Sequence, residues 1–394
     1  MRFSTRAAVI TGCGVVSPLG SGVPAFWDRL VAGHTAVAPV RNFDAADLTP
    51  HAVAEVTDAG AGAGDPDRAG AFALIAAREA LAQAGLDVGL DGARAGVALG
   101  TTLGGMLLFE GWDAAVAGNR AVRDDVERIP YYAPAVRVAR AFGCHGPVAT
   151  AQLACASGTH AVAMAAEWVR AGRADVVLAG GADLLCRFVI AGFNALRATA
   201  DEARPFDQDR RGLVLGEGAA VVVVEDAAHA AARGVNVGAR ILGMGAAGDA
   251  VHMTAPDREG GGAARAITAA LADADRRPRD VGFVSAHGTG TPYNDAMEAV
   301  AIARVFGERM VPVDSIKGAI GHSLGAAGAF ETVLCVQALA HGVIPPTAGL
   351  RTLDPACRAI DVVQGEARRH AIDVAVSTSS GFAGSNAALV LGRP

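Results

Sequence analysis

Residues 281–298 read VGFVSAHGTGTPYNDAME, and this stretch decides the fold class. The apolar and small residues of Val281–Ser285 predict a short buried strand. A glycine-rich turn containing His287 follows, and alanine-rich sequence over Ala296–Phe306 predicts a helix. A buried strand that leads through a tight turn into a helix is typical of α/β proteins, whose sheets are covered by helices.

The same alternation runs along the whole chain. Further strands are expected at Ala7–Ile10, Ala95–Leu99, Ala174–Leu178, Ala219–Glu225, Val374–Thr378 and Ala387–Leu391, and further helices at Ala69–Ala84, Gly158–Ala171, Gly262–Ala274 and Ala326–His341. A reactive-looking turn beside a strand in each half is compatible with a duplicated unit, although no clean sequence repeat is visible. We expect an N-terminal half over residues 1–245, a C-terminal half over 246–394, and a flexible surface loop at Asp58–Asp65.

The composition excludes several classes of protein. Hydrophobic residues make up 52% and charged residues 19%, which is typical of a globular chain with a sizeable core. The net charge of -6 disfavours nucleic-acid binding, and we expect no membrane span because no run reaches roughly 18 apolar residues. The six cysteines form no CxxC pair, so we expect reduced thiols in a cytoplasmic protein, with no metal and no cofactor.

The segment Ala151–His160, AQLACASGTH, contains the candidate nucleophile. Cys155 lies at a turn that opens an alanine-rich helix, near free N–H groups and the positive end of the helix dipole. Both features favour the thiolate, which is the nucleophilic form. The alternative interpretation of this segment alone is a buried structural cysteine.

Two further segments carry histidines. His287 directly follows a strand, where α/β sheets expose active-site groups, and Asp295 and Glu298 are three apart on the helix that follows. In Ser315–Glu331, SIKGAIGHSLGAAGAFE, Lys317 lies five residues before His322 and would help to keep that imidazole neutral. The alternatives are a histidine that only caps its turn and a lysine that is a solvated surface charge.

The segment Ser377–Asn386, STSSGFAGSN, is the fourth candidate. Glycines flank Phe382, so the backbone there can approach a ligand closely and the ring can serve as a gate. The alternative is a tight turn with Phe382 in the core. A nucleotide-binding loop is poorly supported, because no acidic residue follows at the required spacing.

Taken in order, four segments resemble the elongating β-ketoacyl-ACP synthases of the thiolase superfamily. These segments are ACASG, AHGTGTPYND, KGAIGHSLGAAG and SGFAGSN, and VITGCGVVSPLGSG and RPFDQDRRGLVLGEGAAVVVVED extend the resemblance over nearly the whole chain. The resemblance implies a thiolase-like five-layered αβαβα fold built from two pseudo-duplicated halves. It also implies decarboxylative Claisen condensation of an acyl chain with malonyl-ACP, in fatty-acid or type II polyketide and polyene biosynthesis.

The resemblance implies a role for each matching position. Cys155 would carry the acyl chain, and the amides of Cys155 and Phe382 would form the oxyanion hole. His287 and His322 would stabilise the enolate, supported by Lys317 and by the acidic residues Asp295, Glu298 and Glu331. Leu103 and Phe193 would line the acyl pocket, and Arg68 and Arg197 would contact the carrier protein. The implied partners are an acyl carrier protein with its phosphopantetheine and either a second copy or a chain-length-factor-like subunit.

The sequence departs from the family pattern at three places. Leu153 replaces a threonine that is usual two residues before the nucleophile, and Ala383 replaces a glycine beside the gate. We expect the methyl group of Ala383 to stiffen or shift the Phe382 loop. The stretch VRDDVERIPYYAP at residues 122–134 differs most, which leaves the chain-length preference open.

Two alternative functions fit the same resemblance. A non-catalytic partner subunit is disfavoured because such subunits lack the nucleophile, whereas Cys155, His287 and His322 are all present. An acyltransferase that uses the thiol without condensation is disfavoured by the two histidines. Release of carbon dioxide from malonyl-ACP distinguishes a condensing enzyme from both.

Overall fold

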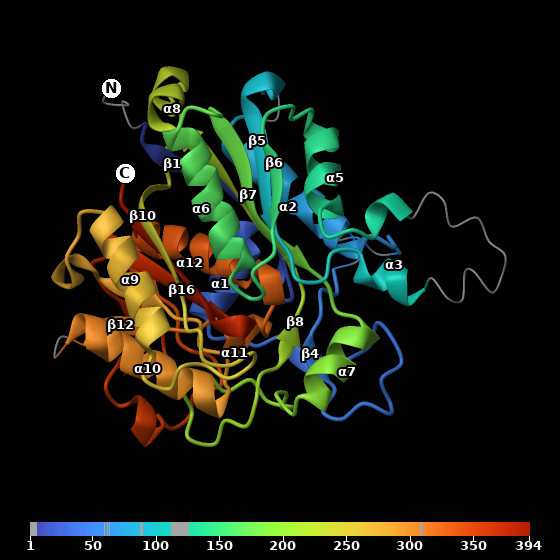
Figure 1. The fold of residues 1–394 in the computed structure, drawn as a ribbon, viewed down its shortest axis with the longest axis vertical. Coiled ribbons are helices and arrows are strands. Elements are labelled where there is room, and N and C mark those ends of the chain that lie inside the picture. The colour runs from blue at the N-terminus through green and yellow to red at the C-terminus, as the bar shows by residue number, and fades with distance from the viewer. Residues whose placement is uncertain are drawn as a thin grey trace.

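The chain folds into five alternating layers of helices and sheet (Figure 1). The computed structural model describes residues 6–394 apart from 59, 61, 63, 87–89, 112–125 and 308–309. Three of the residues of the predicted loop at Asp58–Asp65 therefore lie outside the described residues, as do the first four of 122–134.

Two half-sheets form the β-layers. The first contains β1 (Ala8–Ser17), β5 (Ala95–Gly100), β6 (Val148–Ala151), β7 (Val176–Asp183) and β9 (Gly218–Asp226). The second contains β10 (Ala239–Gly248), β11 (Phe283–Ser285), β12 (Pro312–Asp314), β14 (Asp361–Val362), β16 (Val374–Gly381) and β17 (Ser385–Gly392). They join where Val9 and Ile10 of β1 pair with Arg240 and Ala239 of β10.

Strand order reveals the duplication that the sequence hides. The first half-sheet runs β6-β5-β7-β9-β1 and the second runs β12-β11-β16-β17-β10, with β14 added at its edge. In both, the first three strands are parallel and the last two are antiparallel to their neighbours. This shared order confirms the predicted α/β fold of two pseudo-duplicated halves.

The position of β10 bears on the expected division of the chain. A boundary at residue 245 would cut this strand, which spans Ala239–Gly248. Because β10 occupies in the second half-sheet the place that β1 occupies in the first, we place the start of the second repeat at β10, after α8 (Ala227–Arg233).

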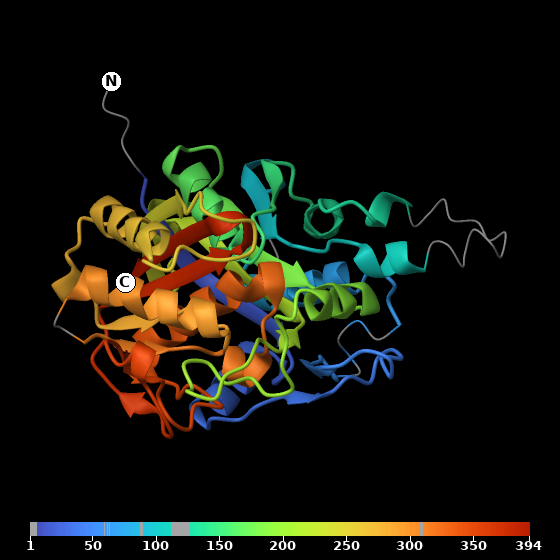
Figure 2. The same ribbon diagram turned by 60° about the horizontal axis from the view of Figure 1, so that its bottom comes forward.

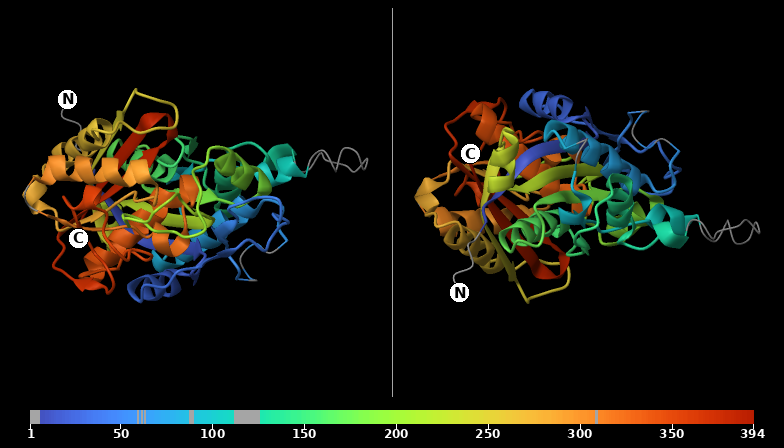
Figure 3. Two further views of the ribbon diagram at one scale, coloured as in Figure 1. Left: turned by 90° about the horizontal axis from the view of Figure 1, so that it is seen from below. Right: turned by 90° about the horizontal axis from the view of Figure 1, so that it is seen from above.

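Helices form the three remaining layers. The outer face of the first half-sheet is covered by α2 (Arg68–Gln83) and α5 (Ala133–Phe142), and that of the second by α9 (Gly261–Asp273) and α10 (Pro292–Phe306). In Figure 2 the gold and orange α9 and α10 lie against the red strands, and Figure 3 shows the two repeats side by side along the longer dimension. The remaining α-helices and strands do not belong to the five layers: α1 (Val23–Val31), α3 (Met106–Glu110), α7 (Arg187–Ala195), α11 (Lys317–Ile320), β2 (Gly20–Ser21), β3 (Val37–Pro39), β4 (Ala52–Ala54), β8 (Leu215–Gly216), β13 (Val343–Ile344) and β15 (Arg368–Arg369).

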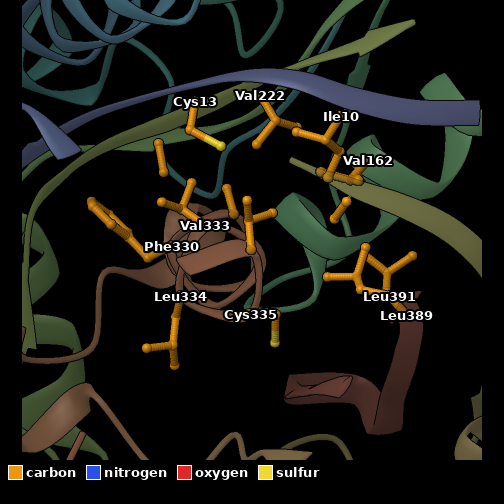
Figure 4. Close-up of a cluster of buried hydrophobic side chains, with 14 of the residues drawn as sticks. Ile10, Cys13, Val162, Val222, Phe330, Val333, Leu334, Cys335, Leu389 and Leu391 are labelled. Carbon is orange, nitrogen blue, oxygen red and sulfur yellow. The ribbon is translucent and has the colours of Figure 1, made fainter. Parts of the chain in front are cut away.

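The middle layer consists of α6 (Ser157–Arg170) and α12 (Ala327–His341), which lie between the two half-sheets. Figure 4 shows α12 nearly end-on, with Cys13 and Val222 of the first half-sheet on one side and Leu389 of the second on the other. This burial explains why the helix is apolar all round.

One stretch of the described chain, Leu324–His341, is long and apolar enough to cross a membrane by length and composition alone. The sequence analysis overlooked it. Inside the protein 83% of it is buried, so its apolarity is that of a core helix.

Candidate functional site

Cys155 lies at the start of α6, as predicted, in a strained turn. The preceding residue, Ala154, adopts a φ of 50°, a left-handed conformation that side chains disfavour. The Ser157 hydroxyl donates a hydrogen bond to the Ala154 carbonyl at 2.6 Å and accepts one from the Leu153 amide at 2.8 Å. This bracing fixes the direction of the Cys155 side chain, which is 7% exposed.

His287 follows β11 and is held through its backbone. Its amide and that of Gly288 donate to the two carboxylate oxygens of Glu298, each at 2.7 Å, and the Thr378 hydroxyl donates to the same carboxylate at 2.8 Å. Asp295 accepts from the Phe206 amide at 2.7 Å, so it ties the turn after His287 to a neighbouring loop. The two acidic residues singled out in the sequence thus orient the His287 turn.

His322 lies in the loop between α11 and α12. Its amide donates to the Val214 carbonyl at 2.7 Å, and its carbonyl accepts from the Gly216 amide at 2.9 Å, so β8 fixes the loop on both sides. The rings of His322 and His287 meet edge to face, with centroids 5.2 Å apart.

A single cavity of about 350 Å³ brings the predicted residues together. Cys155, His287 and His322 all line it, although they are far apart in the sequence. Its other lining residues include Phe382 of the predicted gate, Phe193 of the predicted acyl pocket, and Arg197. The thiol and the two imidazoles therefore line one cavity that a ligand can enter.

Both imidazoles are neutral in this environment. Burial lowers the pKa of His287 well below its usual value, and the charge of Lys317, together with the charge that His322 would carry if protonated, lowers it further. Burial and then Lys317 act in the same way on the pKa of His322. A neutral imidazole can donate one hydrogen bond and accept another, so the pair can polarise a carbonyl or accept a proton.

The thiol differs from the expectation that its position favours the thiolate. Burial raises the pKa of Cys155 to about 12, and Asp183 and Glu331 raise it while Lys317 lowers it. The positive charge of Lys317 favours the thiolate, but burial outweighs it. The Cys155 thiol is therefore protonated in this environment.

Lys317 is buried, which is unusual for a lysine. Its side chain is 3% exposed and forms an ion pair with Glu331. The other oxygen of Glu331 accepts from the Ser379 hydroxyl at 3.2 Å, and Ser379 shares a hydrogen bond of 2.7 Å with Thr159 of α6. This chain joins the lysine behind the histidines to the helix that carries Cys155.

At Gly381 the gate loop lies close to the backbone of the Cys155 turn. A Cβ added to Gly381 would come within 3.0 Å of the Leu153 carbonyl oxygen and 3.2 Å of the Cys155 nitrogen. Phe382 stacks on Phe193 with centroids 5.7 Å apart. Ala383 adopts a left-handed φ of 62°, and its amide donates to the Met253 carbonyl at 2.7 Å.

The remaining predicted positions are less central. Leu103 is buried in the core of the first half-sheet, and Arg197 is exposed at the cavity. Arg68 forms an internal ion pair with Glu217 at 2.6 Å and has a side chain only 14% exposed, and its contact with the carrier protein stays a prediction. Leu153 is 38% exposed, and within 122–134 Tyr131 and Tyr132 are 42% and 56% exposed.

Asp183 is a site residue that the sequence analysis missed. It ends β7 fully buried and accepts hydrogen bonds from the amides of Thr102, Leu103 and Gly325 and from the Thr101 hydroxyl, at 2.7–2.9 Å. It thus ties the end of β5 to the loop after His322. An acidic residue at the end of a wholly buried strand is the signal that could have identified it.

Comparison with known proteins gives matches over almost the whole chain. Models of the β-ketoacyl synthase N-terminal and C-terminal domains match residues 5–230 and 238–351. The tetracenomycin polyketide synthase ketoacyl synthase alpha subunit of Streptomyces glaucescens is 41% identical over 420 aligned residues, which cover 100% of this chain and 98% of that protein.

Solved structures give the same result. The ishigamide ketosynthase/chain length factor has a TM-score of 0.93 at 37% identity, with 99% of this chain and 100% of that chain covered. A type II ketosynthase, AntDE, in complex with its acyl-carrier protein AntF has a TM-score of 0.91 at 31% identity, with the same coverage of 99% and 100%.

Proposed function

Because the chain belongs to the β-ketoacyl synthase family, we propose that it joins an acyl chain held on Cys155 to a malonyl group held on an acyl carrier protein, with loss of carbon dioxide. The product is used in fatty-acid or type II polyketide biosynthesis. The observation that carries the proposal is that the thiol and the two neutral imidazoles line one cavity.

The first step is transfer of the acyl group. The Cys155 sulfur attacks the thioester carbonyl of acyl-ACP, the bond to the carrier sulfur breaks, and the carrier leaves as a thiol. The Cys155 proton has to be removed during attack, because burial raises its pKa to about 12. A neutral imidazole in the same cavity can accept it, and the amides of Cys155 and Phe382 would stabilise the oxyanion.

The second step is decarboxylation. His287 and His322 would donate hydrogen bonds to the thioester carbonyl of malonyl-ACP, so that negative charge develops on an oxygen they already contact as the carboxylate leaves as carbon dioxide. No base is needed to form the carbanion. Lys317 serves this step indirectly, since its charge disfavours protonation of both rings.

Condensation then completes the cycle. The enolate carbon attacks the carbonyl of acyl-Cys155, a carbon–carbon bond forms, and the carbon–sulfur bond breaks. Cys155 takes up one proton and is restored as a thiol. Overall, acyl-ACP, malonyl-ACP and one proton give β-ketoacyl-ACP, carbon dioxide and free ACP.

The partners follow from the relatives. AntDE is a ketosynthase in complex with its carrier protein, and the ishigamide structure pairs a ketosynthase with a chain length factor. We infer that this chain takes a carrier protein at the cavity mouth, where Arg197 is exposed and suits an acidic partner, and that it pairs with a second copy or a chain-length-factor-like subunit in the cytoplasm.

The test combines mass spectrometry with gas release. Incubation with acyl-ACP should add the acyl mass to Cys155, and malonyl-ACP should then release carbon dioxide and give the β-ketoacyl product. Cys155→Ala should abolish acylation, whereas Cys144→Ala, which also removes a buried thiol, should retain it. Acylation without carbon dioxide would instead indicate an acyltransferase, and no acylation would indicate a non-catalytic subunit.

A further inference from the structure

A second group of buried polar side chains lies behind the histidines. Ser285 of β11 pairs in register with Asp314 of β12 and with Ser377 of β16. Residues paired in this way lie side by side on the same face of a sheet. This face packs on α12, where Glu331 and Cys335 lie, and Lys317 comes from the adjacent α11.

Asp314 is the acidic residue of this group that forms no hydrogen bond among the described residues. It is fully buried, and neither carboxyl oxygen has a hydrogen-bond partner among the described residues. The hydroxyls of Ser285 and Ser377 beside it are likewise buried without a partner among those residues. They are neutral groups and cannot compensate a full negative charge.

The charges around Asp314 do not balance if every group is ionised. The described charged and titratable groups facing it are Lys317, Glu331 and Cys335. The Lys317 ammonium is already paired with Glu331, and burial raises the pKa of Cys335, which keeps that thiol neutral. An ionised Asp314 would thus be a second buried carboxylate around one cation, and an unpaired buried charge costs several kcal/mol.

We propose that Asp314 is held protonated and acts as a positioning residue, because its neutrality leaves Glu331 as the single charged partner of Lys317. This inference rests on the proposed role of Lys317 beside the histidines. The direction of the pKa agrees with it, since burial, and then the charge of Glu331, raise the pKa of Asp314 well above its usual value.

The proton on Asp314 matters to the reaction through Lys317. While Asp314 is neutral, Glu331 is the one carboxylate that pairs with the Lys317 ammonium. Hydrogen bonds from Glu331 to Ser379 and from Ser379 to Thr159 then connect this ion pair to α6. Loss of the proton would offer the ammonium a second carboxylate and would offset the positive charge that helps to keep His287 and His322 neutral. The proton thus protects both the geometry and the charge of the site.

Infrared spectroscopy tests the protonation state without turnover. A buried protonated carboxyl group has a carbonyl stretching band separate from that of carboxylates. The spectrum of the unmodified protein near pH 7 minus that of Asp314→Asn, whose amide mimics the neutral acid, should contain such a band. The difference is needed because burial also raises the pKa of Glu298 to about 7, and that carboxyl contributes equally to both spectra. Asp373→Asn, which removes a carboxylate that is 85% exposed, should keep the band. Identical spectra for the unmodified protein and Asp314→Asn would overturn the proposal.

Thermal unfolding gives an independent readout. A carboxyl whose pKa is raised on folding contributes most to stability at low pH, and this contribution is lost as pH rises toward the folded pKa. The melting temperature of Asp314→Asn minus that of the unmodified protein should therefore increase as pH rises from about 5 to about 8. Asp373→Asn should show no such trend. A loss of stability in Asp314→Asn that grows with pH would mean an ionised Asp314 and would refute the inference.

A pH profile of carbon dioxide release connects Asp314 to the reaction. If Asp314 positions Lys317, the alkaline fall in turnover should lie at higher pH in Asp314→Asn than in the unmodified protein. An unmoved profile would refute the positioning role. Inactivity of every variant, together with an intact infrared band, would count against the proposed function and not against the protonated Asp314.

Discussion

At the scale of single residues, Cys155 shows how opposing effects combine. The start of α6 and Lys317 favour the thiolate, but the side chain is 7% exposed and the cost of burying a charge prevails. Nucleophilic strength must therefore come from removal of the proton once substrate is bound, and not from a resting thiolate.

This balance predicts how Cys155 reacts with a small alkylating agent. Burial raises its pKa to about 12, so the alkylation rate should rise about tenfold per pH unit between about pH 7 and 10 without a plateau. A peptide thiol should level off near its ordinary pKa of about 8.5. The rate is measured by iodoacetamide labelling and mass spectrometry of the Cys155 peptide. A plateau below about pH 8 would show that the helix and Lys317 prevail over burial.

The backbone of the gate loop is strained at Ala383, which adopts a left-handed φ of 62°. Such a conformation costs an alanine about 1 kcal/mol, and a glycine much less. Ala383→Gly should therefore raise the free energy of unfolding by about 0.5–1 kcal/mol, reduced by the greater entropy of glycine in the unfolded chain.

The control for Ala383 lies in the adjoining strand. Ala388 of β17 is 1% exposed in extended backbone, so Ala388→Gly should destabilise the protein by about 1 kcal/mol. Chemical denaturation measures both variants. Equal destabilisation by the two substitutions would mean that the Ala383 conformation carries no strain.

At the scale of elements, periodicity predicted the long helices well. The helix expected at Ala69–Ala84 spans Arg68–Gln83, and that expected at Gly158–Ala171 spans Ser157–Arg170. Strand β10 was missed because Gly243 and Gly245 resemble turn residues. In the fold, a Cβ at either position would come within 2.4 Å of the backbone of α9. The absence of a side chain at these glycines therefore allows α9 to pack directly on the strand.

The site shows the same division between what sequence can and cannot predict. Cys155, His287, His322 and Lys317 were found because each sits in a motif. Asp183 and Asp314 were missed because their importance comes from burial beside distant elements, which no local pattern contains. The internal ion pair of Arg68 with Glu217 is likewise a product of tertiary structure.

The crossing of α6 and α12 gives a prediction about an element contact. A Cβ at Gly328 of α12 would lie 1.9 Å from the Thr159 hydroxyl of α6, so Gly328→Ala must push the helices apart. We expect a loss of about 1–3 kcal/mol in the free energy of unfolding. Because α6 carries Cys155 and α12 follows His322, condensation should slow by on the order of 100-fold.

Gly192 supplies the matched control. It also lies in a helix, α7, but an added Cβ there meets nothing within 4 Å. Gly192→Ala should therefore stabilise the protein by about 0.5–1 kcal/mol through helix propensity. Denaturation and carbon dioxide release compare the two variants. Unimpaired stability in Gly328→Ala would show that the helix crossing is not tightly packed.

At the scale of the whole molecule, the two repeats share one core. The central helix α12 belongs to the second repeat, yet Ile10, Cys13 and Val222 of the first pack with it in one hydrophobic cluster (Figure 4). The site is divided in the same way, with the thiol in the first repeat and both imidazoles in the second. Neither the core nor the site is complete in one repeat.

This sharing predicts the behaviour of a chain divided between α8 and β10. Fragments of residues 1–235 and 236–394, made together, should associate and recover carbon dioxide release, because the cut lies in a connection and leaves every described strand intact. Made alone, each should fail to unfold cooperatively, since it exposes the surface that α6 or α12 buries. Co-purification through a tag on one fragment and near-ultraviolet circular dichroism measure this. A single fragment with cooperative unfolding would show that its repeat is an independent domain, and that the layers meet by docking instead of by folding together.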